Sequence, residues 1–345
     1  MEKSIRLLLD SSSSRFVDSV RNDKASEPFE ILEYLEDWPK VPPSLAREAD
    51  AIFWHKDYLS GEVIRSADSL KFIQKNGLNC KNIDVAAATE RKIPVASLSL
   101  IRNATVAEHA MALMLTCARN ILRAHRSVVQ GSYRDLGLEP IQTDQWNYKP
   151  NWAQIEGIDD LYGTTVGVIG MGDIGMEIAK RCRAFGMDVV YHQRTPHPKE
   201  TEERHEVRYL PFDDLIAAVD FLILVLPHTP ETENLIGEKQ FQEMKPTATL
   251  INVARGGVVD ENALVEALRA GQIAMAGLDV YREEPLPESN PLIQLPNVVL
   301  TPHNGGGSYR HRLVDRKAGL DNILRFFCGE TPSGIINGER HLESL

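Results

Sequence analysis

One stretch, residues 164–195, limits what this chain can fold into more than any other part of the sequence. It opens with a β-branched apolar run at 166–169, typical of a strand buried on both faces of a parallel sheet. The motif GMGDIG follows at residues 170–175, and apolar residues then recur at helical spacing until Gly186. A second strand is predicted at 189–191. This order of strand, glycine turn, helix and strand indicates a dinucleotide-binding βαβ unit.

The residues of the glycine turn have separate expected roles. Gly170 permits the tight turn, Gly172 lets a pyrophosphate approach the backbone, and Gly175 lets the helix close on the strand. Asp173 and Ile174 begin the helix, whose free N–H groups favour an anion. We therefore expect these five residues to bind the pyrophosphate of a dinucleotide.

The length of the chain, 345 residues, favours two domains, because one hydrophobic core seldom extends so far. Strands and helices alternate along both parts of the chain, so we expect an α/β protein with two doubly wound parallel-sheet domains. A Rossmann-type dinucleotide-binding domain at residues 103–308 is expected to be inserted into a smaller flavodoxin-like substrate domain, made of residues 1–102 plus 309–345. In the smaller domain, strands are predicted at 5–9, 51–54, 70–73 and 93–95.

The longest helical pattern covers residues 103–129, with Thr105 expected as its N-cap and Glu108 completing a capping box. Its apolar residues lie nearly all round, as in a helix buried between larger parts. Residues 131–160 are rich in aromatic and polar residues without periodicity, which indicates an extended arm. Because interfaces are enriched in Tyr and Trp, the arm predicts contact within a homodimer. A wrap over the chain's own surface is the alternative.

The charge of the chain indicates which partners it lacks. A net charge of −11 argues against a nucleic-acid or anionic-membrane surface, because both need clustered Lys and Arg. The four cysteines have no CxxC or CxxH spacing, so we expect no metal site. The apolar runs at 110–118 and 221–226 are shorter than the ~20 residues of a membrane span. We expect a cytoplasmic protein whose partners are small molecules and a second copy of itself.

Polar residues end several strands predicted in the second domain. Arg255, Asp279 and His303 follow three of these strands, so they should gather at the carboxyl edge of the sheet, where ligands of such folds bind. Arg255, on a tight turn before two glycines, suits a carboxylate held by two parallel hydrogen bonds. His303 is a candidate general acid or base, and Glu284 could hold its second ring nitrogen. The alternatives are a surface arginine and a structural histidine.

The motifs VGVIGMGDIG, LPHTPET, INVARGGVVD, GLDVYREEPLP and TPHNGG occur in this order along the chain. They resemble those of the D-isomer-specific 2-hydroxyacid dehydrogenase family across nearly the whole sequence. The resemblance implies hydride transfer between NAD(P)H and a 2-oxo acid or D-2-hydroxy acid. It implies that Arg255 binds the substrate carboxylate and carbonyl, that His303 donates a proton to the carbonyl, and that Glu284 orients His303. Asp279 would hydrogen-bond the nicotinamide carboxamide.

The resemblance also implies further contacts. Within the matching motifs, we expect Pro227, Thr232, Ala254 and Gly305 to contact the cofactor. The turn at Asn76, Gly77, Leu78 and Asn79 would bind the substrate carboxylate through backbone N–H groups. Asn79 stands where the family commonly has a second glycine, and this departure leaves the identity of the substrate open.

A second departure concerns the cofactor. The strand that ends near His192 lacks the acidic residue that would hydrogen-bond the ribose 2′-hydroxyl and repel a 2′-phosphate. Gln193, Arg194 and Thr195 instead offer an amide, a cation and a hydroxyl. This resembles NADP-preferring members, so NADP is expected to be preferred, with NAD possible. The alternative is that Arg194 points away and the site is indifferent.

A different class of function stays open. Transcriptional corepressors that sense dinucleotides resemble this fold and retain the Arg, Glu and His. Such proteins are expected to carry low-complexity tails or peptide-docking surfaces, whereas this chain starts and stops close to its predicted domains. A formate dehydrogenase is a further alternative, disfavoured because that branch looks different at Glu284.

Overall fold

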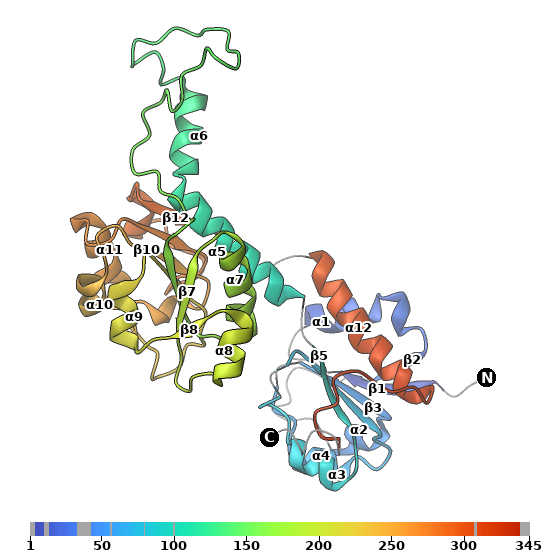
Figure 1. Ribbon diagram of the computed structural model, residues 1–345. Helices are drawn as coiled ribbons and strands as arrows, with labels where there is room; N and C mark the ends of the chain where they lie inside the picture. The colour runs from blue at the N-terminus through green and yellow to red at the C-terminus, as the bar shows by residue number, and fades with distance from the viewer. Residues whose placement is uncertain are drawn as a thin grey trace. The chain divides into compact units, whose positions relative to one another are not determined.

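The structure is a computed structural model that describes residues 4–9, 14–32, 43–55, 57–78, 80–98, 101–306 and 309–338. The chain divides into two compact units (Figure 1). Unit 1 comprises Met1–Arg102 and Ser308–Leu345, and unit 2 comprises Asn103–Gly307. Each unit is built around its own parallel sheet with helices on both faces.

The sheet of unit 2 has seven strands, in the order β12-β11-β10-β9-β6-β7-β8, and all its pairings are parallel. The first strand of the unit, β6, therefore lies between β7 and β9, so the order reverses there. In open α/β sheets, ligands bind in the crevice at such a reversal. The predicted Rossmann-type sheet is confirmed. Its strands are β6 (Thr165–Ile169), β7 (Asp188–His192), β8 (Arg208–Tyr209), β9 (Phe221–Leu224), β10 (Thr249–Asn252), β11 (Met275–Leu278) and β12 (Val298–Leu300).

Two apolar clusters cover the faces of this sheet. Strand residues such as Val168 and Ile223 pack with helices α5 and α7 on one face. Leu222 and Leu250 pack with α9, α10 and α11 on the other. The helices of unit 2 are α5 (Arg102–Ala118), α6 (Ile121–Gln130), α7 (Asp173–Ala184), α8 (Lys199–His205), α9 (Phe212–Ala218), α10 (Glu238–Glu243) and α11 (Glu261–Ala270).

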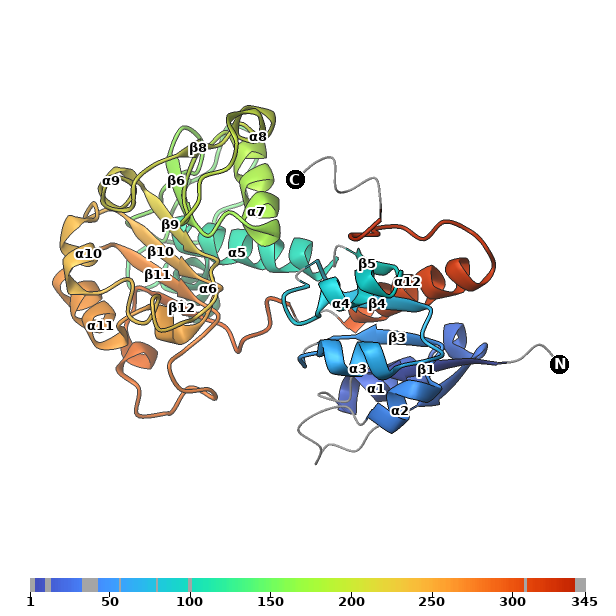
Figure 2. The same ribbon diagram turned by 90° about the horizontal axis from the view of Figure 1, so that it is seen from below.

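The sheet of unit 1 has five parallel strands in the order β2-β1-β3-β4-β5, which is the flavodoxin-like order. Helix α12 lies along this sheet (Figure 2). Its Leu320 and Ile323 are fully buried, and its Asn322 donates a 2.7 Å hydrogen bond to Gln74 on β4. The elements are β1 (Ile5–Leu9), α1 (Ser14–Arg21), β2 (Phe29–Leu32), α2 (Pro43–Glu48), β3 (Ala51–Trp54), α3 (Gly61–Ser66), β4 (Phe72–Asn76), α4 (Val85–Glu90), β5 (Val95–Leu98) and α12 (Tyr309–Phe327).

Unit 1 departs from the sequence prediction at the edge and centre of its sheet. Strand β2 was not predicted, because prolines on both sides of it suggested loop and short helix. The strand predicted at 70–73 is β4, which runs from Phe72 to Asn76. The sequence places Asn76 in the turn after this strand, but the pairing of β4 with β5 extends the strand through it.

The long helix predicted at 103–129 is two helices, and its predicted cap is wrong. Helix α5 begins at Arg102, so Thr105 lies inside it and is 8% exposed rather than capping its first turn. Asn120 adopts a left-handed backbone with a φ of 49°, which separates α5 from α6. Asn tolerates this conformation better than most residues, because its short polar side chain bonds to nearby backbone.

The arm at residues 131–160 consists of turns and extended backbone and projects from unit 2 together with α6 (Figure 1). Several of its large side chains are exposed, including Trp146 at 87% and Tyr148 at 61%. Val128 and Val129 on α6 are exposed as well. In the part of the chain that the structure describes, no helix is long and apolar enough to span a bilayer.

Candidate active site

The glycine turn after β6 has the shape that a pyrophosphate requires. Gly170 has a φ of +99°, and a Cβ there would lie 2.3 Å from the carbonyl oxygen of Val225. A Cβ at Gly175 would lie 2.4 Å from the carbonyl oxygen of Gly170. Gly172, by contrast, has open space where its Cβ would be, and it begins α7 without a side-chain cap. The N–H groups of Asp173 and Ile174 in the first turn are therefore accessible to an anion.

Gln193, Arg194 and Thr195 follow β7 directly. Nε2 of Gln193 donates a 2.7 Å hydrogen bond to the carbonyl of Thr195, so this side chain stabilises the turn that the three residues form. The side chain of Arg194 is exposed. The pKa of Glu231, in the segment after β9, is lowered mainly by a hydrogen bond from the Thr229 hydroxyl and in smaller part by the charge of Arg194. Arg194 in the segment after β7 is therefore close enough to Glu231 in the segment after β9 for their charges to interact.

The segment after β9 is held by Thr232. The hydroxyl of Thr232 donates to the carbonyl of Pro227 at 2.8 Å and accepts the N–H of Thr229 at 2.8 Å. Thr232 therefore stabilises the conformation of this loop through two hydrogen bonds to its backbone. Pro227 is exposed, so its surface remains available to a ligand.

Arg255 lies on a turn after β10 that Asn252 fixes. Asn252 is 1% exposed, donates to the carbonyl of Arg255 at 3.2 Å and accepts the N–H of Ala254 at 3.0 Å. A Cβ at Gly256 would lie 1.9 Å from the backbone of Tyr281, so only glycine allows the two loops to approach so closely. The guanidinium of Arg255 is exposed and donates to the carbonyl of Ala254 at 2.5 Å.

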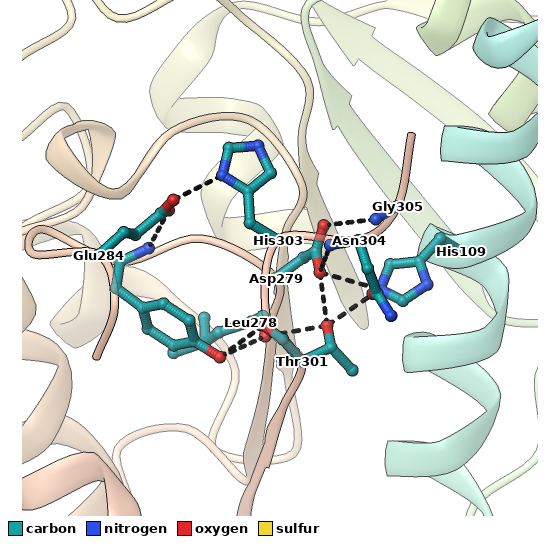
Figure 3. A network of polar contacts seen from close by, with 9 residues as sticks. His109, Leu278, Asp279, Glu284, Thr301, His303, Asn304 and Gly305 are labelled. Carbon is teal, nitrogen blue, oxygen red and sulfur yellow. Dashed lines mark hydrogen bonds and ion pairs between the residues drawn. The ribbon is translucent and has the colours of Figure 1, made fainter. Parts of the chain in front are cut away.

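His303 and Glu284 are in direct contact (Figure 3). Nδ1 of His303 lies 2.6 Å from Oε2 of Glu284, and Oε1 of Glu284 accepts the N–H of Tyr281 at 3.1 Å. Because a carboxylate only accepts hydrogen bonds, Nδ1 carries a proton and Nε2 is left for another partner. A hollow beside the pair is lined by Tyr281, Glu284, Pro285, Leu286, Leu300, Thr301, Pro302 and His303. Among the described residues, no hydrogen bond or ion pair joins Arg255 to this pair.

Asp279 follows β11 and is 3% exposed. Its Oδ1 accepts the hydroxyl of Thr301 at 2.7 Å and the N–H of Asn304 at 3.0 Å, and its Oδ2 accepts the N–H of Gly305 at 2.9 Å (Figure 3). Nε2 of His109 lies 3.2 Å from Oδ1. Burial opposes ionisation of this carboxyl, but the hydrogen bonds from His109, Thr301 and the two N–H groups outweigh it and lower the pKa of Asp279 to about 2.

These contacts bear on the expectation that Asp279 binds a nicotinamide carboxamide. A carboxylate has roughly four acceptor positions, and here four donors of the chain itself surround it. A carboxamide would therefore have to share or displace one of them. Gly305, expected to contact the cofactor, donates its N–H to this carboxylate.

Sequence reasoning missed two residues of this network. His109 on α5 was read only as part of an apolar helix, although an imidazole among buried Ala and Met residues was a signal of a specific partner. Tyr281 is 7% exposed, and its hydroxyl donates to the carbonyl of Thr301 at 2.8 Å. Tyr281 therefore joins the loop that carries Glu284 to the segment that carries His303.

The turn expected to bind the substrate lies at the carboxyl end of β4 in unit 1. Gly77 has a φ of 106°, which only glycine adopts readily, and Leu78 is 42% exposed. Nδ2 of Asn76 lies 3.0 Å from Nδ1 of His55. Asn79 is outside the described residues. Lys75, which the sequence did not single out, is 5% exposed and donates to the carbonyl oxygens of His55 and Asn76.

The model of the family described as D-isomer specific 2-hydroxyacid dehydrogenase, NAD binding domain, matches residues 111–305, more than half of the chain. The chain belongs to this family of D-2-hydroxyacid dehydrogenases. The match covers every strand of unit 2, from the glycine turn to the segment that carries His303.

Individual proteins of the family resemble the chain over most of its length. A glyoxylate reductase of Thermococcus litoralis is 37% identical over 91% of this chain and 92% of its own. A D-3-phosphoglycerate dehydrogenase of Archaeoglobus fulgidus is 43% identical over 71% of this chain and 43% of its own. The solved NADPH-dependent glyoxylate/hydroxypyruvate reductase of Sinorhizobium meliloti, in complex with citrate, is 29% identical, covers 96% of this chain and 97% of its own, and has a TM-score of 0.67.

These similarities show that the protein is an enzyme, an oxidoreductase that uses a nicotinamide dinucleotide. They favour the enzyme over the corepressor that the sequence left open. The glycine turn fits the cofactor, because it leaves the N-terminus of α7 open to a pyrophosphate.

The low pKa of Asp279 makes the stability of unit 2 dependent on pH. Its value of about 2 lies below the ordinary 3.8, so the ionised form stabilises the fold at neutral pH, and this contribution of about 2 kcal/mol disappears as pH falls from about 4 toward 2. In urea unfolding, Asp279→Asn should be less stable than wild type at pH 7, and the difference should shrink below pH 4. Asp214→Asn, at an exposed position of α9, is the control. A difference that stays constant across this range would contradict the assignment.

Proposed function

We propose that this enzyme reduces a small 2-oxo acid to the D-2-hydroxy acid with NADPH. The observation that carries the proposal is the 2.6 Å contact between His303 and Glu284 at the carboxyl edge of the sheet. A histidine whose Nδ1 is bound by a carboxylate presents Nε2 as an acid or base of defined orientation. The bound nicotinamide supplies the hydride, and the chain supplies binding, orientation and the proton.

In this proposal, His303 donates the proton of its Nε2 to the carbonyl oxygen as that oxygen becomes an alkoxide. Glu284 fixes the ring through Nδ1 and stabilises its positive charge before the transfer. Arg255 stabilises the developing oxyanion and anchors the substrate carboxylate with its planar fork. Its exposed guanidinium contacts only the carbonyl of its own chain neighbour among the described groups, so it can turn to a substrate.

The proposed substrate class rests on the groups that would bind a carboxylate and on the names of similar proteins. The backbone N–H groups near Gly77 and Leu78 are proposed to hold the substrate carboxylate, because the positive φ of Gly77 is typical of turns whose successive amides bind an anion. Similar proteins are named glyoxylate reductases, so glyoxylate and hydroxypyruvate should be assayed first. Pyruvate, branched and aromatic 2-oxo acids and a sugar acid would complete the panel.

The acid–base roles predict a specific kinetic pattern. His303→Asn should lower the turnover of 2-oxo acid reduction by roughly 10²- to 10⁴-fold, the usual contribution of a positioned acid, while NADPH still binds. Reduction uses the imidazole as a proton donor and oxidation uses it as a proton acceptor, so His303→Asn should slow both directions. Glu284→Gln should also slow reduction, because the variant lacks the carboxylate that lies 2.6 Å from Nδ1 and fixes the ring.

The measurement is the rate of single-turnover reduction, with saturating NADPH and a deuteride isotope effect to confirm that hydride transfer limits the rate. Glu283→Gln, one residue away, is the matched control. Equal rates for wild type and Glu284→Gln would remove Glu284 from the mechanism. Near-normal turnover in His303→Asn would refute the proposed acid.

We propose NADPH as the preferred cofactor because no acidic residue stands near Gln193, where NAD-binding members place one, and an exposed Arg194 follows it. Arg194→Ala should weaken NADPH binding by about 1.5–3 kcal/mol, the range for hydrogen bonds to charged groups, and should leave NADH binding almost unchanged. Cofactor fluorescence titration measures both. Arg204→Ala, on the following helix, is the control. Equal losses for the two cofactors would show that Arg194 has only a structural role.

We also propose that the enzyme is a cytoplasmic homodimer in which α6 and the arm at 131–160 contact the second copy. Val128, Val129, Trp146 and Tyr148 are exposed, and such a surface is typical of an interface. Replacing Trp146 and Tyr148 by Ser should lower the mass measured by light scattering. A wild-type chain that is monomeric at micromolar concentration would contradict this prediction.

A further inference from the structure

The backbone at His303 has an uncommon conformation. Its φ is 51°, in the left-handed region that non-glycine residues adopt only when the surrounding structure holds them there. The next two peptide groups show what holds it. The N–H groups of Asn304 and Gly305 donate to the two oxygens of Asp279, so one buried carboxylate fixes the chain immediately after His303. The direction in which the imidazole leaves the backbone therefore depends on where Asp279 is.

The carboxylate of Asp279 is itself held by His109 of α5. Nε2 of His109 lies 2.9 Å from the hydroxyl oxygen of Thr301 and 3.2 Å from Oδ1 of Asp279 (Figure 3). The hydroxyl of Thr301 has one proton, which it donates to Oδ1 at 2.7 Å. The oxygen of Thr301 is therefore an acceptor toward His109, which means that Nε2 carries a proton.

His109 also packs directly on the segment that follows His303. A Cβ at Gly305 would lie 3.0 Å from Oδ2 of Asp279 and 3.2 Å from Cδ2 of His109. The ring and the carboxylate thus both border the space that a side chain at residue 305 would occupy. With its side chain 19% exposed, His109 is shielded enough for these hydrogen bonds to be stronger than in water.

We propose that His109 is a positioning residue for the acid–base pair. Through its proton on Nε2, it holds Thr301 and Asp279, which hold the peptide groups after His303 and so aim the imidazole at Glu284. This inference rests on the proposed reduction of 2-oxo acids, in which His303 is the acid. It adds a residue of α5 that is remote in sequence from the motifs that carry the chemistry.

The test compares two substitutions of equal length. In His109→Gln, the amide nitrogen is three bonds from Cβ, as Nε2 is in His, so the N–H donor is retained. His109→Met has a side chain of the same length without a donor. The single-turnover rate of reduction should fall about 10- to 100-fold in His109→Met, since a 1 Å misplacement of a reacting group costs up to about 10²-fold. His109→Gln should stay within about threefold of wild type, and the substrate KM and the NADPH Kd should change little in both.

A second measurement does not depend on turnover. Hydrogen exchange followed by mass spectrometry on a peptide that covers residues 301–306 reports the N–H groups bound to Asp279. Exchange there should be faster in His109→Met than in wild type, and His109→Gln should restore protection. His205→Met, at an exposed position of α8, controls for loss of an imidazole as such.

The outcomes separate the two hypotheses. If the wild type reduces no 2-oxo acid, the proposed function fails, and the exchange measurement still tests the positioning network. If the wild type is active and His109→Met matches it in rate and in exchange, the positioning role is wrong. Equal losses in His109→Gln and His109→Met would show that only the shape of the ring matters. A loss confined to NADPH binding would show that His109 supports the cofactor rather than His303, and would also overturn the proposal.

Discussion

The buried charge of Asp279 must be compensated inside unit 2, and the arrangement of the carboxyl edge of the sheet follows from this requirement. An ionised carboxyl at 3% exposure is tolerated only when hydrogen bonds replace the water it has lost. The donors come from the segment after β12 and from α5: the hydroxyl of Thr301, the N–H groups of Asn304 and Gly305, and the imidazole of His109. To bring the two N–H groups to Asp279, the chain after β12 must bend around the carboxylate. This bend turns His303 toward Glu284.

Close approach of backbones completes the site. The turn after β6 passes so near the segment after β9 that Gly170 has no room for a side chain, and the turn after β10 meets the loop of Tyr281 in the same way at Gly256. Because the strands are parallel, these loops all lie at the carboxyl edge of the sheet, and glycine allows their backbones to approach closely there. The N-terminus of α7 is left open beside them, as a dinucleotide requires. Membership of the D-2-hydroxyacid dehydrogenase family agrees with this arrangement.

The residues proposed to transfer the proton and those proposed to bind the cofactor phosphate are held in different ways. The His303–Glu284 pair is exposed, but the chain beside it is held by hydrogen bonds to the buried Asp279. Gln193, Arg194 and Thr195, by contrast, lie on a short segment closed by a single side-chain hydrogen bond. In the proposal, selectivity between NADPH and NADH would rest on these few side chains, which lie outside the sheet and the acid–base pair.

The sequence by itself determined the parallel sheet of unit 2 and the glycine turn, and its motifs, through their resemblance to a family, indicated that Glu284 orients His303, a contact that the structure shows. Strand periodicity, glycine spacing and the order of motifs depend on neighbours along the chain, so they are readable without coordinates. Only the tertiary structure decided that β2 pairs with β1, that Asn120 ends α5, and that His109 contacts Asp279. Those features arise where segments distant in sequence meet, because hydrogen bonds and burial there outweigh local preference.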